Sequence, residues 1–253
     1  MIDIHCHILP GMDDGAQTFA DSLDMAKEAV REGISSIIAT PHHNQSYHNT
    51  KDEIILAVKD LNNSLKEASI PLEILPGQEV RIYGEIVEGL NNGEILSLSQ
   101  SQYMFIEFPS NHVPRYADKI LFDIQLQGLI PIIVHPERNK QLIEQPNLLY
   151  QFVEKGALTQ VTASSLCGYF GKNIKKFSEQ LIEFNLTHFI ASDAHNVKNR
   201  TFKMAEALDV VDSKYGPDMV YLFKENAELL VENSNIMKEL PERIKRKKFL
   251  GIF

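Results

Sequence analysis

The stretch Met1-Ile2-Asp3-Ile4-His5-Cys6-His7-Ile8-Leu9 opens the chain and decides how the rest of it is organised. Its β-branched and apolar residues predict a strand, which the following Pro-Gly pair ends. Because side chains alternate across a strand, His5 and His7 project from one face and Cys6 from the other. Two imidazoles aimed at one point, followed by two aspartates, predict half of a metal site. A strand with two core or surface histidines is the alternative, and recurring ligands elsewhere would decide between them.

The composition is that of a globular protein. The chain has 253 residues, of which 43% are hydrophobic and 23% charged, and no apolar run is long enough to cross a bilayer. The N-terminus lacks the basic and then apolar pattern of a secretory signal, so we expect a cytoplasmic location. The formal net charge of -9 argues against nucleic acid as a partner. Cys6 and Cys167 are the only cysteines, which excludes a disulfide framework and a thiolate zinc finger.

Short β-rich runs alternate with stretches of helical period, which is typical of repeated βα units. The expected strands cover residues 1–9, 36–40, 72–75, 103–106, 130–134, 158–162 and 188–192. The expected helices cover residues 21–32, 51–68, 117–127, 148–154, 172–184, 201–212 and 219–231. Without a linker or repeat, residues 1–253 are expected to form a single domain with a basic and apolar C-terminal tail at about 241–253.

The ends of the expected strands share a chemical character. Six of the seven finish in residues able to bind a metal, namely His7, His42, Glu79, Glu107, His135, and the pair Asp193 and His195. A closed α/β barrel gathers the carboxyl ends of its strands around one mouth, where such enzymes keep their chemistry. We therefore expect an α/β, TIM-like βα barrel of seven strands. An open doubly wound sheet is the alternative, but it would use a Gly-rich phosphate turn that this sequence lacks.

The candidate ligands form a mixed nitrogen and oxygen set: His5, His7, Asp14, His42, Glu79, Glu107, His135, Asp193 and His195. One transition metal ion usually takes four to six ligands, so the set indicates two or three ions. Without thiolates it favours manganese, iron or zinc, and its carboxylates favour the harder ions among these.

Five motifs carry a resemblance to a known superfamily: His5-Cys6-His7, Pro41-His42-His43, Gly77-Gln78-Glu79, His135-Pro136-Glu137-Arg138 and Ser192-Asp193-Ala194-His195. In this order they resemble the PHP (polymerase and histidinol phosphatase) superfamily, whose fold is a distorted seven-stranded βα barrel with a trinuclear metal centre. More narrowly, the chain is similar along essentially its whole length to the manganese-dependent tyrosine-protein phosphatases of bacterial capsule and exopolysaccharide gene clusters.

The resemblance also implies roles for the ligands. It implies a first ion held by His5, His7, Glu79 and Asp193, a second held by the bridging Glu79 with Glu107 and His135, and a third held by Asp14, His42 and His195. Many members of the superfamily have histidine where this chain has Asp14 and Glu107, so the site is more anionic, in agreement with manganese rather than zinc.

The expected chemistry is phosphate ester hydrolysis. A hydroxide that bridges two ions would be acidic enough to form near neutral pH and would attack phosphorus in line. Guanidinium groups bind phosphoryl oxygens bidentately, and Arg138 and Arg200 match the phosphate-binding arginines of the family. Surface ion pairs are the alternative role for both arginines. A cysteine mechanism is excluded, because neither cysteine is followed by an arginine six positions later.

The resemblance implies that the substrate is phosphotyrosine on a membrane-associated bacterial tyrosine kinase and its targets, in the control of polysaccharide synthesis. A histidinol-phosphate phosphatase is the enzymatic alternative, and a PHP scaffold without catalysis is the other. The tail from Arg243 to Phe253 could meet an anionic membrane or the kinase, although a solvated or packed end is the default. The physiological metal, the range of substrates, the general acid and the oligomeric state are left open.

Overall fold

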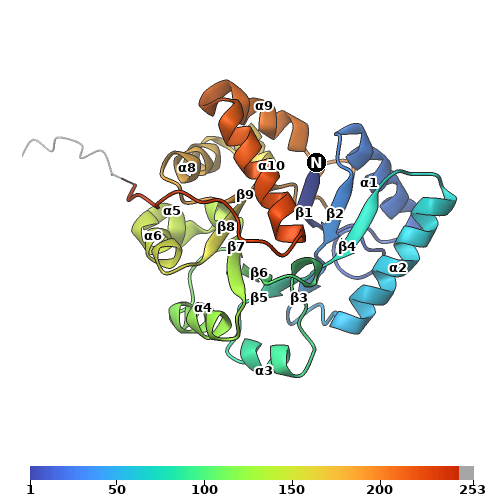
Figure 1. Cartoon of the computed structure of the whole chain (residues 1–253), viewed down its shortest axis with the longest axis horizontal. Coiled ribbons are helices and arrows are strands. Elements are labelled where there is room, and N and C mark those ends of the chain that lie inside the picture. The colour runs from blue at the N-terminus through green and yellow to red at the C-terminus, as the bar shows by residue number, and fades with distance from the viewer. Residues whose placement is uncertain (245–253) are drawn as a thin grey trace, which may run out of the picture.

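Parallel strands lie at the centre of the molecule and helices surround them (Figure 1). The protein is represented by a computed structural model that describes residues 1–244. The strands are β1 (Ile2–Cys6), β2 (Ser36–Ala39), β3 (His42–His43), β4 (Glu73–Pro76), β5 (Glu79–Arg81), β6 (Tyr103–Glu107), β7 (Ile130–Val134), β8 (Leu158–Thr162) and β9 (Phe189–Ala191).

The helices follow the strands in alternation. They are α1 (Phe19–Arg31), α2 (Lys51–Glu67), α3 (Ile86–Asn91), α4 (Ala117–Leu126), α5 (Lys140–Glu144), α6 (Pro146–Glu154), α7 (Ala163–Cys167), α8 (Lys172–Glu183), α9 (Met204–Tyr215) and α10 (Pro217–Val231), with short 3-10 turns at Leu98–Gln100 and Pro136–Arg138. Each expected helix is present, whereas the short helices α3, α5 and α7 were not expected from the periodicity.

Every strand pair is parallel, which confirms the α/β class. The strands form two sheets, in the orders β1-β2-β4 and β3-β5-β6-β7-β8-β9. A closed seven-stranded barrel is therefore not confirmed. The division lies just after the expected strands at residues 36–40 and 72–75, at Pro41 between β2 and β3 and at Gly77 between β4 and β5, and the short strands β3 and β5 were not expected. Proline cannot donate to a ladder, and a Cβ on Gly77 would lie 2.6 Å from Ile38 Cγ2.

A β-bulge in β1 aims the two histidines of the first motif. Asp3 opposes Ile37 and Cys6 opposes Ala39, so β1 takes three steps where β2 takes two. An extra residue of this kind moves the following side chains to the other face of the strand. The His5 ring consequently lies 4.9 Å from the ring of Phe105, on the interior side of the strands.

The apolar core has two parts. The larger lies between the strands and the surrounding helices. The smaller lies between the strands of the two sheets and α10, and includes Ile4, Phe105 and Val134 together with Ala227 and Leu230 of α10. Figure 1 shows α10 lying across the middle of the molecule, over the strands. The buried face of α10 therefore covers one end of the interior, which leaves the carboxyl ends of the strands for polar side chains.

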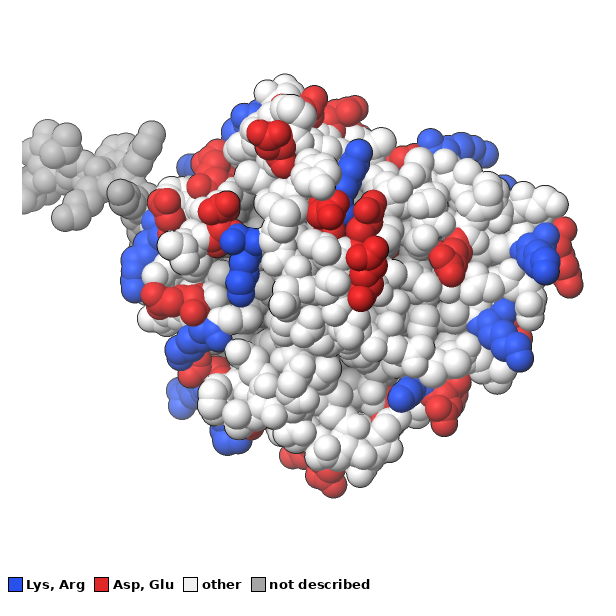
Figure 2. Space-filling model, viewed as in Figure 1, with Lys and Arg blue, Asp and Glu red and all other residues white. Residues whose placement is uncertain are grey.

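The described surface is mixed in charge. On the face shown in Figure 2, acidic and basic residues lie interspersed around a broad uncharged area. Among residues 1–244, no helix combines the length and the apolar character needed to cross a bilayer. The expected C-terminal tail begins within the described residues, where Arg243 lies over the ring of Tyr150, but residues 245–253 lie outside them.

Candidate metal centre

The first group of ligands surrounds a point at the ends of β1, β5 and β9. His7 Nε2 lies 3.3 Å from both His5 Nε2 and Asp193 Oδ1, and 3.4 Å from Glu79 Oε2. His5 Nε2 lies 3.5 Å from each of the two carboxylates. This spacing matches the separation between ligand atoms around one ion whose bonds are about 2.1 Å long. All four side chains are buried, so water does not compete for their lone pairs.

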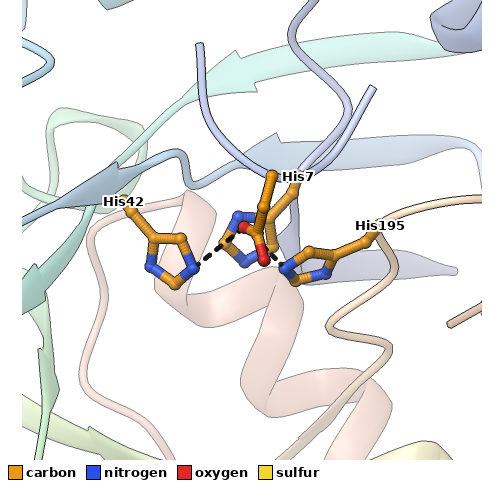
Figure 3. A group of neighbouring side chains, drawn as sticks. His7, His42 and His195 are labelled. Carbon is orange, nitrogen blue, oxygen red and sulfur yellow. Dashed lines mark ion pairs between the residues drawn. The ribbon is translucent and has the colours of Figure 1, made fainter. Parts of the chain in front are cut away.

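A second group lies on the other side of His7. Asp14 Oδ1 is 3.3 Å from the Nε2 atoms of both His42 and His195. Figure 3 shows His7, His42 and His195 turned toward one another, with dashed lines for the ion pairs that His42 and His195 make. Ligand atoms of these three histidines and Asp14 all lie within 4.8 Å of one another, which is compact enough for a shared cation.

A third group gathers on Glu79. His135 Nε2 lies 2.9 Å from Glu79 Oε1 and 4.0 Å from Glu107 Oε1. His42 Nδ1 approaches the other Glu79 oxygen at 2.8 Å, and His42, Glu79 and Glu107 also form a compact set of donors. Glu79 therefore contacts members of all three groups, as a bridging ligand would.

The outer nitrogen of three of these histidines is held by the protein. His5 Nδ1 is 2.8 Å from Gln160 Oε1, His7 Nδ1 is 2.6 Å from Asp13 Oδ2, and His195 Nδ1 is 3.0 Å from the carbonyl oxygen of Asp193. Each acceptor requires a proton on Nδ1, which leaves the Nε2 lone pair free to face the interior of the site. Metal-binding histidines are oriented by partners of this kind.

Several buried polar atoms at this point make close ionic contacts but no hydrogen bond of good geometry, among them Glu79 Oε2, Glu107 Oε2, His42 Nδ1 and His195 Nε2. Buried polar atoms are rarely left unpaired in native proteins. Because these atoms converge and all are lone-pair donors to metals, the donor set fits divalent cations.

The protonation pattern shows how strongly the groups interact. Burial disfavours charge on Glu79 and His42, but each stabilises the other, so the pKa of Glu79 lies well below its usual range and that of His42 rises to about 10. Burial and the Glu79 carboxylate raise the pKa of Glu107 to about 7. Burial and the Arg138 cation lower the pKa of His135 to about 4, which keeps its imidazole neutral, as a metal ligand must be.

Both predicted arginines reach the same centre. Arg138 Nη2 lies 2.6 Å from Asp193 Oδ2, and Arg200 Nη2 lies 3.3 Å from the same oxygen. They line a cavity of about 290 Å³ together with Glu79, Glu107 and His135. Arg138 Nε has no hydrogen-bond partner, and the guanidinium lies 5.5 Å from the centre of the Phe170 ring. Arg138 therefore has a donor group that no acceptor of the described residues occupies, while Arg200 Nη1 and Nη2 contact Asp14 and Asp193.

The structure thus brings all eleven predicted site residues together, while their individual roles stay predictions. Three supporting residues were not predicted: Asp13, Gln160 and Arg81, whose Nε lies 2.9 Å from Glu107 Oε2. Asp13 adjoins a predicted ligand, and Gln160 is a polar residue within a buried strand. These two sequence positions were the signals from which the supporting roles of Asp13 and Gln160 could have been predicted. Cys6 is buried, and its Sγ faces the carbonyl oxygen of Ala194 at 3.5 Å.

Comparison with known proteins gives concordant results. A family model described as "Capsular polysaccharide synthesis, CpsB/CapC" matches residues 1–232. The chain is 54% identical over 254 residues to tyrosine-protein phosphatase YwqE of Bacillus subtilis strain 168, covering all of both chains. It is 30% identical to tyrosine-protein phosphatase CpsB of Streptococcus agalactiae serotype III, covering 93% of this chain and all of that one.

A solved structure gives the same picture. It comes from work on YwqE of Bacillus subtilis and CpsB of Streptococcus pneumoniae, described there as metal-dependent tyrosine phosphatases. The match has a TM-score of 0.95 at 54% sequence identity, and it covers 97% of this chain and all of the other.

Proposed function

The chain belongs to the CpsB/CapC family of capsular polysaccharide synthesis proteins, and from this membership we propose that it is a metal-dependent protein-tyrosine phosphatase. The observation that supports the proposal is the convergence of nine candidate metal ligands beside a cavity that is lined by five of them and by Arg138 and Arg200. None of the nine ligands is missing, which argues against a scaffold without catalysis.

We propose the ligand assignment implied by the superfamily, with His5, His7, Glu79 and Asp193 at one ion. Glu107 and His135 would complete a second ion with Glu79, and Asp14, His42 and His195 would hold a third. The short distances among His5, His7, Glu79 and Asp193 support the first assignment, and those of Asp14 to His42 and His195 support the third. The many carboxylate oxygens favour manganese, with iron or zinc as alternatives.

The protein's own residues orient the substrate. Divalent ions at this centre would neutralise phosphoryl oxygens and make a bound water acidic. Arg138 and Arg200 bind the remaining phosphoryl oxygens, replacing part of their present contact with Asp193. The arginines thus hold the phosphorus next to the metal centre.

The walls of the cavity favour an aromatic ester. Phe170 lies against the Arg138 guanidinium, and Tyr47 stacks on His42 with 6.0 Å between ring centroids. Of the aromatic side chains, Tyr47 and Phe108 line the cavity, and Phe170 adjoins it through Arg138. Aromatic side chains in and beside the cavity suit a phenyl ring better than the short side chain of phosphoserine.

We infer the biological setting from the family. We propose that the substrate is a tyrosine kinase associated with the bacterial membrane, together with its targets, and that the enzyme acts from the cytoplasm on polysaccharide synthesis. We also propose that residues 1–253 form one domain whose two sheets are parts of a distorted PHP-type barrel. A backbone hydrogen bond of 2.9 Å from Asp193 N–H to the His5 carbonyl oxygen brings the segment after β9 beside β1, which supports a barrel-like arrangement.

One experiment tests the activity. The purified protein is analysed for metal and assayed on a phosphotyrosine peptide, the matching phosphoserine peptide and histidinol phosphate, with added manganese and with chelator. We expect turnover of the phosphotyrosine peptide with manganese and loss of that turnover with chelator. Preferential turnover of histidinol phosphate would support the alternative phosphatase, and turnover that resists chelation would refute the metal mechanism.

A further inference from the structure

A groove of about 720 Å³ runs beside the catalytic cavity. It lies between the segment that follows β3 and the segment that follows β5, with Tyr116 at its edge. Asn44, Ser46 and Arg81 line both the groove and the cavity, so the two are continuous. None of the nine candidate metal ligands lines the groove, which leaves its role unexplained by the metal centre.

Aromatic rings form much of the groove. The ring of His43 lies 5.0 Å from that of His48 and 6.2 Å from that of Tyr83, so the three follow one another along the wall. Tyr116 is 44% exposed, and its hydroxyl makes one long hydrogen bond within residues 1–244, of 3.5 Å to the Ile82 carbonyl oxygen. An exposed ring such as that of Tyr116 attracts aromatic and cationic side chains.

The groove is also acidic. Glu85 and Glu94 line it, and neither makes an ion pair with any residue of the described part of the chain. The cation nearest to them in the lining, Arg81, is already engaged by Glu107 and by the Phe108 carbonyl oxygen. The negative charge of these carboxylates acts on the neighbouring Tyr83: burial, and then repulsion by Glu94 and Glu85, raise the pKa of its hydroxyl.

We propose that this groove binds the substrate polypeptide beside its phosphotyrosine and selects a lysine or arginine there, a few residues from the phosphorylated side chain. The inference rests on the proposed function, because it takes the cavity as the phosphotyrosine site. A polypeptide whose phosphotyrosine enters the cavity would pass Asn44 and Ser46 and then contact the aromatic rings and the two glutamates of the groove. The unpaired Glu85 and Glu94 then complement a cationic side chain, whereas the metal centre attracts only the phosphate.

The test compares two phosphotyrosine peptides that differ only in carrying lysine or glutamate two to four residues from the phosphotyrosine on both sides. p-Nitrophenyl phosphate reports the cavity alone. The variants are Glu85→Gln with Glu94→Gln, and separately Tyr116→Ala. Matched controls are Asp209→Asn with Asp212→Asn on α9, which remove the same charge away from the groove, and Phe122→Ala, which removes a 58% exposed ring from α4.

For the unaltered protein we expect kcat/KM to be about fivefold higher on the lysine peptide at low ionic strength, as exposed charge pairs allow, and less so at high salt. The double glutamine variant should bring this ratio close to one through KM. Tyr116→Ala should lower kcat/KM on both peptides. Activity on p-nitrophenyl phosphate should be the same in all variants and controls.

Two results would overturn the inference while leaving the proposed function intact. The first is equal use of both peptides by an active unaltered protein. The second is a lysine preference that survives the double glutamine change or is lost equally in the α9 control. If the manganese-loaded protein turns over neither peptide and not p-nitrophenyl phosphate, the proposed function itself fails, and the inference fails with it.

Discussion

Replacing Asp13 by asparagine should weaken metal binding, although Asp13 is not among the predicted ligands. The carboxylate is 2.6 Å from His7 Nδ1 and accepts backbone N–H groups from His42 at 3.0 Å and Gly15 at 2.9 Å. Burial disfavours its charge, but the His7 ring holds the pKa of Asp13 below its usual range. Asparagine is isosteric but offers one acceptor oxygen and no charge, so at least one of the three hydrogen bonds must be lost.

The expected magnitude follows from these contacts. Losing the anionic partner makes His7 Nε2 a weaker donor and leaves the ring less firmly oriented. Removing such a partner typically weakens metal affinity about 10- to 100-fold, or about 1.4 to 2.7 kcal/mol. The lost hydrogen bond and its unpaired buried donor should lower the metal-free stability by about 1 to 3 kcal/mol.

The assay is a manganese titration with a competing chelator, followed by activity at saturating metal. Asp24→Asn is the control, because Asp24 is an exposed carboxylate that pairs with Lys27. Metal affinity should fall in the Asp13 variant and stay constant in the control, and saturating manganese should restore most of the activity. An Asp13→Asn protein that is folded and binds manganese as tightly as the unaltered protein would refute the role assigned to this hydrogen bond.

Three further predictions follow from other contacts. Arg138→Ala should lower kcat/KM on phosphotyrosine peptide about 100-fold or more with unchanged metal content, because hydrogen bonds to the charged phosphate are lost. Arg138→Lys should restore only part of the lost activity, and unchanged kinetics would remove Arg138 from the site. Cys6→Ser should keep most activity, because burial holds the pKa of this thiol well above its usual range, and inactivity with metals still bound would contradict this. Burial and the nearby Lys238 lower the pKa of His188 from 6.5 to about 3. Between pH 6.5 and about pH 3 the unfolded chain therefore binds a proton at His188 that the folded protein does not bind, so the stability of the folded protein falls as the pH falls. At pH 5 this costs about 2 kcal/mol relative to pH 8, and denaturant titrations of His188→Gln should show a correspondingly smaller acid loss.

The sequence was informative where local rules govern the structure. Alternation along the first strand correctly placed His5 and His7 together, and the ends of the expected strands indicated most of the other side chains that gather around them. For these residues the position relative to the preceding strand was enough. Arg138 and Arg200, which line the same cavity, were indicated by the family resemblance and not by strand position.

The sequence was not informative where the structure depends on pairing between strands that are far apart in the chain. The bulge in β1 depends on how Asp3 and Cys6 are matched to β2, which no local pattern encodes. Pro41 and Gly77 lie just after the expected strands at residues 36–40 and 72–75, but the sequence did not identify them as points at which the chain passes from one sheet to the other. The contact of Gln160 with His5 joins residues 155 positions apart, and only the assembled sheet reveals it.

The charge balance of the cavity connects the metals to the choice of substrate. The carboxylates of the candidate metal centre, Asp14, Glu79, Glu107 and Asp193, outnumber its guanidinium groups, Arg81, Arg138 and Arg200, and a phosphate monoester adds further negative charge near neutral pH. Without cations Arg138 and Arg200 remain paired with Asp193 and Asp14, and the carboxylates repel phosphate. Divalent ions at the carboxylates would neutralise them and leave the guanidinium groups available for phosphoryl oxygens. Phosphate affinity should therefore depend on metal loading, and inorganic phosphate should bind the manganese-loaded protein more tightly than the chelated one.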